Sequence, residues 1–291
     1  MMTRSFAAVA AVATLIAGSA NAGGYAGGGD FQVGISGFIN SAFMASDVDN
    51  RTAKYDTTSI RTDNLVNFTG STVLDNGLKV SAIAGFSLSH GKNEYDLFQE
   101  ELFVEVGGSF GDVRLGRARN AGALLHSYIP SAGIGTFSVD DARTNAFVAG
   151  ATSTATSLGK GEYANRITYF TPRIEGVQLA ASFTPETDGE HNPQGDAFNS
   201  EDNASIQNEY SLAGNYMRDL AGVGVIASVG YTAGEALNST ATTTTIKRDS
   251  EALHAGLALH YAGFTLGGAW GKYEDPTVAS GYTQTLSLIH I

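Results

Sequence analysis

Five charged residues stand at alternate positions of apolar runs, and they are the side chains most able to do chemistry. Successive residues of a β-strand point to opposite faces. Strand parity places these five on the face opposite their apolar neighbours: Arg61, Glu101, Glu105, Arg114 and Arg166. Guanidinium and carboxylate groups that share one surface create a fixed field, which sorts small ions by sign without forming a bond. Arginine suits this task because it stays charged at any working pH.

Patterns for covalent or metal chemistry are weaker. No G-x-S-x-G motif stands out in the sequence. His254 and His260 share a strand face six residues apart, about 20 Å at the ~3.3 Å rise of a strand, which is too far for one metal ion. The stretch from Asp47 to Arg51 begins like a calcium loop but has arginine where a ligand belongs. We therefore predict no catalytic site, no metal site and no cofactor.

The elements that would position the charges are long strands. After the Asp75-Asn76-Gly77 turn, apolar residues occupy every second position from Leu78 to Leu88. The same alternation recurs at 177–184, 223–232 and 253–261. Each stretch predicts a strand with one apolar face backed by small or polar residues.

Composition agrees with an exported all-β chain. The 291 residues include 36 Gly, 12 Tyr and 15 Phe but only 5 Pro and no Cys, so no disulfide framework exists. Residues 1–22 have the features of a cleaved export signal, namely Arg4, an apolar run and Ala20-Asn21-Ala22. The formal net charge of -12 becomes -13 once Arg4 is removed, which argues against a nucleic-acid partner. No segment reaches the ~18 to 20 apolar residues of a spanning helix.

The connections alternate in length. Short turns are expected near 74–77, 107–111, 171–176, 218–222 and 262–263, and long links near 45–60, 89–97, 118–162, 185–205, 233–250 and 274–281. In an up-and-down arrangement this puts tight turns at one end and long loops at the other, as in outer-membrane barrels. A soluble β-sandwich is the alternative, but its strands would be shorter, nearer ~5 to 6 residues. In a barrel the apolar face contacts lipid, the polar face lines a wet lumen, and closure satisfies the backbone.

Three segments resemble the Gram-negative general porins, especially those of alphaproteobacteria. They are DNLVNFTGSTVLDNGLKVSAIAGFSL from residue 63, FQEELFVEVGGSFGDVRLGR ending at residue 117, and NRITYFTPRIEGVQLAASF at 165–183. The resemblance implies a transmembrane antiparallel barrel of the 16-stranded, trimeric type, with a long third loop folded into the lumen. It makes 118–162 the constriction loop, with Asp140 and Asp141 as its acidic cluster; a solvated external loop is the alternative.

The resemblance also places Arg117 on the pore wall, although strict parity puts it beside Val113 and Leu115, so a bulge at Gly116 is hypothesised. The hypothesis is that Arg61, Arg114, Arg117 and Arg166 form a basic wall facing acidic residues of the loop. The alternative is that two or more of them lie at the solvated rim. Overall acidity favours mild cation preference, which the arginines could reverse locally.

The strand number departs from the family. We count eleven strands and the start of a twelfth in residues 23–291, so a C-terminal truncation is expected, with a closed twelve-stranded barrel as the alternative. The sequence thus predicts a non-enzymatic, passive outer-membrane channel for small hydrophilic solutes and ions, with outer-membrane lipid, lipopolysaccharide and two further copies as partners. A plugged barrel that acts as an adhesin or binding protein, and a solute-selective channel, are the alternatives.

Overall fold

The computed structural model is an antiparallel β-sheet protein. It describes residues 12–13, 31–45, 58–90, 95–126, 163–187, 206–240, 244–274 and 282–290. The elements are β1 (Val12–Ala13), β2 (Gln32–Ala45), β3 (Thr58–Val73), β4 (Lys79–His90), β5 (Tyr95–Gly108), β6 (Gly111–Ala118), α1 (Ala121–Leu125), β7 (Ala164–Phe170), β8 (Val177–Glu186), β9 (Ile206–Leu220), β10 (Val223–Thr240), β11 (Thr244–Tyr261), β12 (Phe264–Glu274) and β13 (Tyr282–His290).

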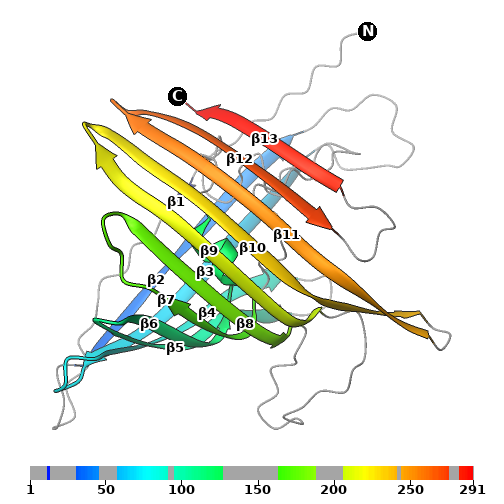
Figure 1. Ribbon diagram of the computed structural model, residues 1–291, viewed down its shortest axis with the longest axis horizontal. Coiled ribbons are helices and arrows are strands. Elements are labelled where there is room, and N and C mark those ends of the chain that lie inside the picture. The colour runs from blue at the N-terminus through cyan, green and yellow to red at the C-terminus, as the bar shows by residue number, and fades with distance from the viewer. Residues whose placement is uncertain are drawn as a thin grey trace.

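The strands form one 13-stranded sheet in which spatial order follows chain order from β1 to β13. Every strand pairs antiparallel with its neighbour in sequence, which confirms the up-and-down arrangement. Figure 1 shows that the sheet is twisted and strongly curved. Among the described residues no ladder joins β13 to β1 or β2, so the sheet is open between these ends. The two-residue β1 lies within the segment expected to be the export signal, and cleavage of that signal stays a prediction.

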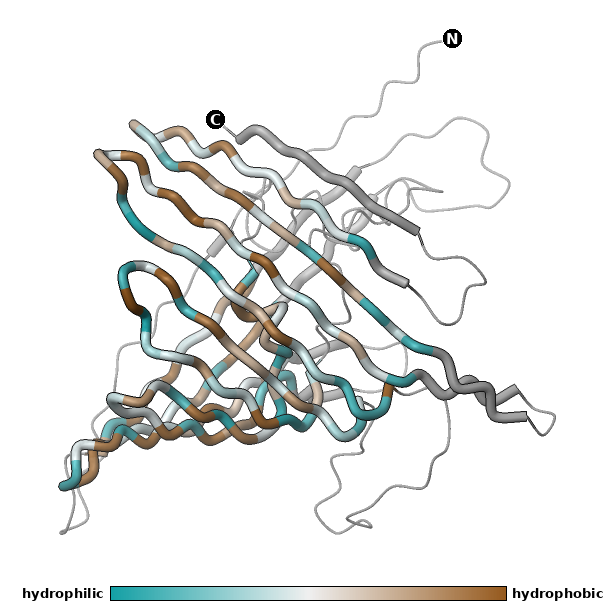
Figure 2. The backbone as a smooth tube through the Cα atoms, in the orientation of Figure 1, coloured by the Kyte–Doolittle hydropathy of each residue, from teal (hydrophilic) through white to brown (hydrophobic). Residues whose placement is uncertain are grey.

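The outer face of the sheet is apolar and exposed, the reverse of a water-soluble protein. Along β8 the exposed positions are Val177, Leu179, Ala181 and Phe183, and along β11 they are Leu253, Leu257 and Tyr261. Figure 2 shows hydrophobic and hydrophilic residues alternating along these strands. Leu115 on β6 is 64% exposed. Such a surface is stable only against an apolar medium, so the predicted lipid-facing parity is confirmed.

The inner face is polar and is the buried face. Its buried residues include Arg166, Thr168, Ser182, Thr184, Glu209, Ser211, Ser228, Thr232 and His254. The helix α1 packs on this side against β8, β9 and β10. Among the described residues, no helix has the length and apolar content needed to cross a bilayer.

The predicted alternation of connections holds in most places and fails at two. Two-residue turns join β9 to β10 and β11 to β12, where Ala221-Gly222 and Ala262-Gly263 all have positive φ, as the twist of a tight hairpin requires. The links expected at 89–97 and 233–250 are largely strand, because β4 continues to His90 and β10 pairs with β11 as far as Thr240 and Thr244. Threonine is common in β-strands, so the polar, threonine-rich segment around 240–245 continues the pairing of β10 with β11 instead of ending it.

A charge placed on the outer face of the sheet should lower the stability of the fold more than the same charge on the inner face. Val104 of β5 pairs with Ala82 of β4 on the outer face. The adjacent pair, Ser81 and Glu105, lies at nearly the same depth, and both of its residues face inward. We expect Val104→Lys to lower the free energy of unfolding in lipid vesicles by about 2–4 kcal/mol if it lies near the bilayer midplane. Ser81→Lys, the matched control, should change it by much less, because its ammonium group faces Glu105. Denaturant titration measures both, and equal losses would contradict the assignment of faces.

Candidate functional site: the inner wall and the start of the long loop

The long connection after β6 turns inward at once. Asn120 begins α1, its Oδ1 accepting a hydrogen bond from the backbone N–H of Ala123 at 2.9 Å. This cap satisfies a donor that the first helical turn leaves without an intrahelical partner. Ala121 and Leu125 pack on Phe170 and Ala180 of the inner wall. The expected inward folding of the third loop is therefore confirmed for its described start, 118–126; residues 127–162 lie outside the described part of the chain.

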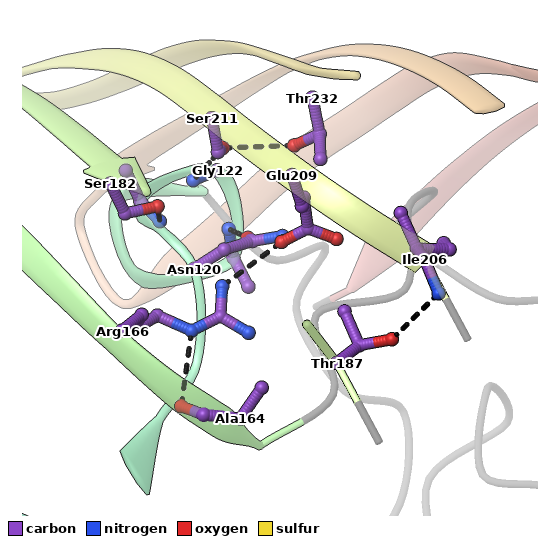
Figure 3. Close-up of polar contacts among 12 residues, drawn as sticks. Asn120, Gly122, Ala164, Arg166, Ser182, Thr187, Ile206, Glu209, Ser211 and Thr232 are labelled. Atoms are coloured by element: carbon purple, nitrogen blue, oxygen red, sulfur yellow. Dashed lines mark hydrogen bonds and ion pairs between the residues drawn. The ribbon is translucent and has the colours of Figure 1, made fainter. Parts of the chain in front are cut away.

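Serine hydroxyl groups of the inner wall accept hydrogen bonds from the first backbone N–H groups of α1. The N–H of Ala121 donates to Ser182 Oγ at 3.0 Å, and that of Gly122 donates to Ser211 Oγ at 2.9 Å. Thr232 Oγ1 on β10 donates to the same Ser211 Oγ at 2.8 Å. Figure 3 shows these hydroxyls converging on the helix from neighbouring strands. Small polar side chains thus bind the loop start while leaving little bulk on the wall.

A buried ion pair lies beside this contact. Arg166 Nη1 on β7 donates to Glu209 Oε1 on β9 at 3.1 Å, and their side chains are 0% and 2% exposed. Asn120 Nδ2 donates to the same carboxylate oxygen at 3.3 Å (Figure 3). Glu209 therefore joins the wall to the residue that caps α1. Arg166 lies on the inner face, as parity predicts, but its charge is covered by Glu209.

A second, more open ion pair lies on the inner face between β5 and β6. Arg114 Nη2 donates to Glu105 Oε2 at 2.8 Å, and the two side chains are 17% and 23% exposed. The guanidinium carbon of Arg114 lies 4.0 Å from the centroid of the Phe103 ring. Stacking of this kind restricts the guanidinium and fixes where its charge lies. The structure thus brings Arg114 and Glu105 together.

Glu101 and Arg117 are placed less simply. Glu101 pairs in register with Gly85 and interacts electrostatically with Arg114 and Arg119. Arg117 lies opposite Leu102 of β5 and remains at a register position of the outer face. The β5–β6 register is continuous through Gly116, so the hypothesised bulge is absent.

Gly116 nevertheless has a φ of 134°, where a Cβ would lie 2.3 Å from the carbonyl oxygen of Leu102. Only glycine fits there. Arg117 itself is partly buried and interacts electrostatically with Tyr163 and Glu100. Its place on the pore wall stays a prediction.

The remaining predicted site residues are not brought into this site by the described structure. Arg61 lies on β3 opposite Ala42 of β2, and its side chain is outside the described part of the chain. Asp140 and Asp141 lie outside the described residues. Sequence reasoning missed Glu209, Asn120, Ser182 and Ser211. Strand parity could have placed Glu209 on the inner face, because it alternates with the exposed apolar residues Tyr210 and Leu212.

Comparison with known proteins agrees with this architecture. A profile of the family described as Gram-negative porin matches residues 7–289. The chain therefore belongs to the Gram-negative porin family, a family of outer-membrane channels.

Two solved porins are similar to the chain. One is the anion-selective porin of Comamonas acidovorans, with 17% identity, 88% of this chain and 82% of that chain covered, and a TM-score of 0.46. The other is OmpF of Salmonella typhi in complex with daunomycin, with 13% identity, coverage of 91% and 84%, and a TM-score of 0.45. Curated protein sequences give no significant match.

The buried ion pair should stabilise the fold far more than an exposed one. We expect Glu209→Ala to lower the free energy of unfolding by about 3–5 kcal/mol, because it leaves the guanidinium of Arg166 buried without its carboxylate. Glu175→Ala is the matched control, because it removes an exposed ion pair with Arg218. The two charged atoms of this pair are 2.6 Å apart, and the side chains of Glu175 and Arg218 are 76% and 49% exposed. Its loss should lower the free energy of unfolding by about 0–1 kcal/mol. Denaturant titration in vesicles measures both. Similar losses in the two variants would contradict the role given to Glu209.

Proposed function

We propose that this porin is a passive diffusion channel for small hydrophilic solutes and ions. The observation that carries the proposal is the combination of an exposed apolar outer face with a polar inner face on which the start of the long loop is bound. A wet lumen narrowed by an inward loop selects solutes by size and ions by lining charge, with no catalytic group.

The ion pair of Arg114 and Glu105 is the part of the proposed lining with the best-defined charges. Because each charge has its partner 2.8 Å away, the pair forms a local dipole and adds no net charge. Arg166 is neutralised in the same way by Glu209. The basic wall of the sequence hypothesis then depends on Arg61 and Arg117, and its acidic counterpart on Asp140 and Asp141. We propose weak ion selectivity, set by these charges and by Glu101.

Assembly and targeting complete the proposal. Residues 1–22 would be removed on export, and residues 23–291 would form the barrel domain, with 118–162 as its constriction loop. The long-loop end would meet lipopolysaccharide, and three copies would associate through their outer faces. The exposed apolar outer face supports a lipid-embedded state.

Planar-bilayer recording tests the channel directly. The protein purified from outer membranes should open in discrete steps whose current is linear in voltage, and liposomes that contain it should swell in small sugars faster than in large ones. Silence of correctly folded protein would contradict the proposal and favour a plugged barrel. Saturating uptake of one sugar class would favour a solute-selective channel.

Neutralising one partner of the lining pair should shift ion selectivity. Glu105→Gln leaves Arg114 charged, so we expect the anion-to-cation permeability ratio to rise about fivefold, because a unit charge ~8 Å from an ion in water favours an anion and disfavours a cation by ~0.5 kcal/mol each. The effect should weaken as salt shortens the Debye length. Glu251→Gln removes a charge that contacts Tyr231 on the outer side and should leave selectivity unchanged. Reversal potentials in a salt gradient measure the ratio; equal ratios in both variants would contradict the lining assignment.

A further inference from the structure

A groove of about 520 Å³ lies on the outer face of the sheet across β7, β8, β9 and β10. Two small outward residues, Ala181 of β8 and Gly214 of β9, form its floor. Larger outward side chains surround this floor: Tyr169, Leu179, Leu212, Val229 and Tyr231. The groove is therefore an apolar hollow in a face that already contacts lipid, and it suits a long apolar ligand.

The groove crosses the strands instead of following one of them. Barrel strands are tilted by ~35–45°, so a lipid acyl chain that lies along the membrane normal must also cross several strands. Neighbouring strands are ~4.8 Å apart, so the groove extends over about 14 Å from β7 to β10. The hydrocarbon of one leaflet is ~15 Å thick. The length of the groove thus matches one acyl chain of one leaflet.

The short-turn end of the groove points toward the membrane surface. On β9 the outward row continues from Gly214 through Tyr216 to the exposed Arg218. Four residues of strand span ~13 Å, which the tilt reduces to about 10 Å in depth. Tyr169 Oη donates a hydrogen bond at 2.6 Å to the carbonyl oxygen of Phe110, in the turn between β5 and β6. Tyrosines in such positions mark the headgroup level, so the groove lies in hydrocarbon and Arg218 lies near the headgroups.

Charges of both signs lie together at this end. Arg218 Nη1 is 2.6 Å from Glu175 Oε2, and both side chains are largely exposed. Arg173 Nη1 donates to the carbonyl oxygen of Gly176 at 2.7 Å, and a Cβ on Gly176 would lie 3.3 Å from the Cβ of Arg218. Two guanidinium groups and one carboxylate therefore flank a single turn. Guanidinium groups bind phosphate oxygens, and a carboxylate accepts hydrogen bonds from an ammonium group.

We propose that the β7–β10 groove binds a phosphatidylethanolamine molecule. One acyl chain fills the groove, the phosphate contacts Arg218 and Arg173, and the ammonium group contacts Glu175. An anionic phospholipid offers the same phosphate but no ammonium group, so it leaves Glu175 beside a headgroup of like charge. The site goes beyond the proposed channel function, because it lies on the lipid side of the wall and needs no open lumen.

Quenching of tryptophan fluorescence by brominated lipids tests the site in vesicles. The chain has a single tryptophan, Trp270, on the outer face of β12, which reports ordinary surrounding lipid. Phe183→Trp combined with Trp270→Phe moves the reporter next to the groove, two residues from Ala181 on the same face of β8. We expect phosphatidylethanolamine to bind about fivefold more tightly than phosphatidylglycerol at position 183, roughly the gain from one charge contact at a membrane surface. The two lipids should bind about equally at Trp270.

Three further variants, made in the Phe183→Trp, Trp270→Phe chain, test the two parts of the site. Ala181→Phe fills the groove, and Glu175→Gln and Arg218→Gln remove the headgroup contacts, so each should lower the fivefold preference to about one. Ala84→Phe is the matched control, because it adds the same ring to the outer face of β4, where Ala84 pairs with Leu102 of β5. It should keep the fivefold preference.

Equal binding of the two lipids at position 183, or a preference for phosphatidylglycerol, would overturn the proposal. Absence of quenching there by either lipid would also overturn it, since a second copy of the chain would then cover the groove. Native mass spectrometry of wild type in an equimolar mixture of the two lipids needs no variant. One retained phosphatidylethanolamine per chain supports the site, and retention of the two lipids in equal amounts overturns it.

Discussion

The constraint on which the structure depends is the pairing of backbone N–H and C=O groups in a hydrocarbon medium. A group left unpaired there costs several kcal/mol, so a strand that crosses the bilayer must have a hydrogen-bonded neighbour on each side. The chain meets this demand by joining each strand to the next one in sequence, through short turns at one end and, at the other end, through links that are long except between β4 and β5 and between β10 and β11. Within the ladder from β2 to β13, every inner strand is paired on both sides.

The lipid-facing exterior forces the specific packing of the protein to the inner face. An apolar medium outside contributes little preference for one side chain over another, so hydroxyls, carboxylates and imidazoles on the inner wall define where the loop starts. Ser182 and Ser211 bind backbone N–H groups of α1, Glu209 binds its cap, and His254 packs against the residue that follows it. The position of the loop start on the inner wall is thus determined by these short contacts. Glycines at the contact allow the backbone of α1 and the wall to approach closely.

Strand faces could be predicted from sequence because parity depends only on local alternation. The outward residues of β8 and β11 follow from this rule alone. The partner of Arg166 could not be predicted, since Glu209 is 43 residues away and on a strand separated from β7 by β8. Strand parity places both residues on the inner face but does not specify which inward side chains of different strands contact each other.

Other features depended on tertiary context. The helix α1 has five residues, which is too short for a periodic pattern, and its stability comes from a cap and from hydroxyls on other strands. The strand extensions near His90 and Thr240 carry a polar sequence and exist because the neighbouring strand offers a ladder to continue. The bulge hypothesised at Gly116 is absent, because this residue takes a positive φ within a continuous β5–β6 register.

The most direct test of the central claim is the reactivity of single cysteines along β4, because the chain has no natural cysteine to interfere. A water-soluble, membrane-impermeant thiol reagent should label Ser81→Cys and Ile83→Cys, which face inward, in protein embedded in lipid vesicles. It should leave Val80→Cys, Ala82→Cys and Ala84→Cys largely unlabelled, because these face the acyl chains. Uniform labelling along the strand, or a pattern with the two faces exchanged, would contradict a sheet with lipid outside and water inside.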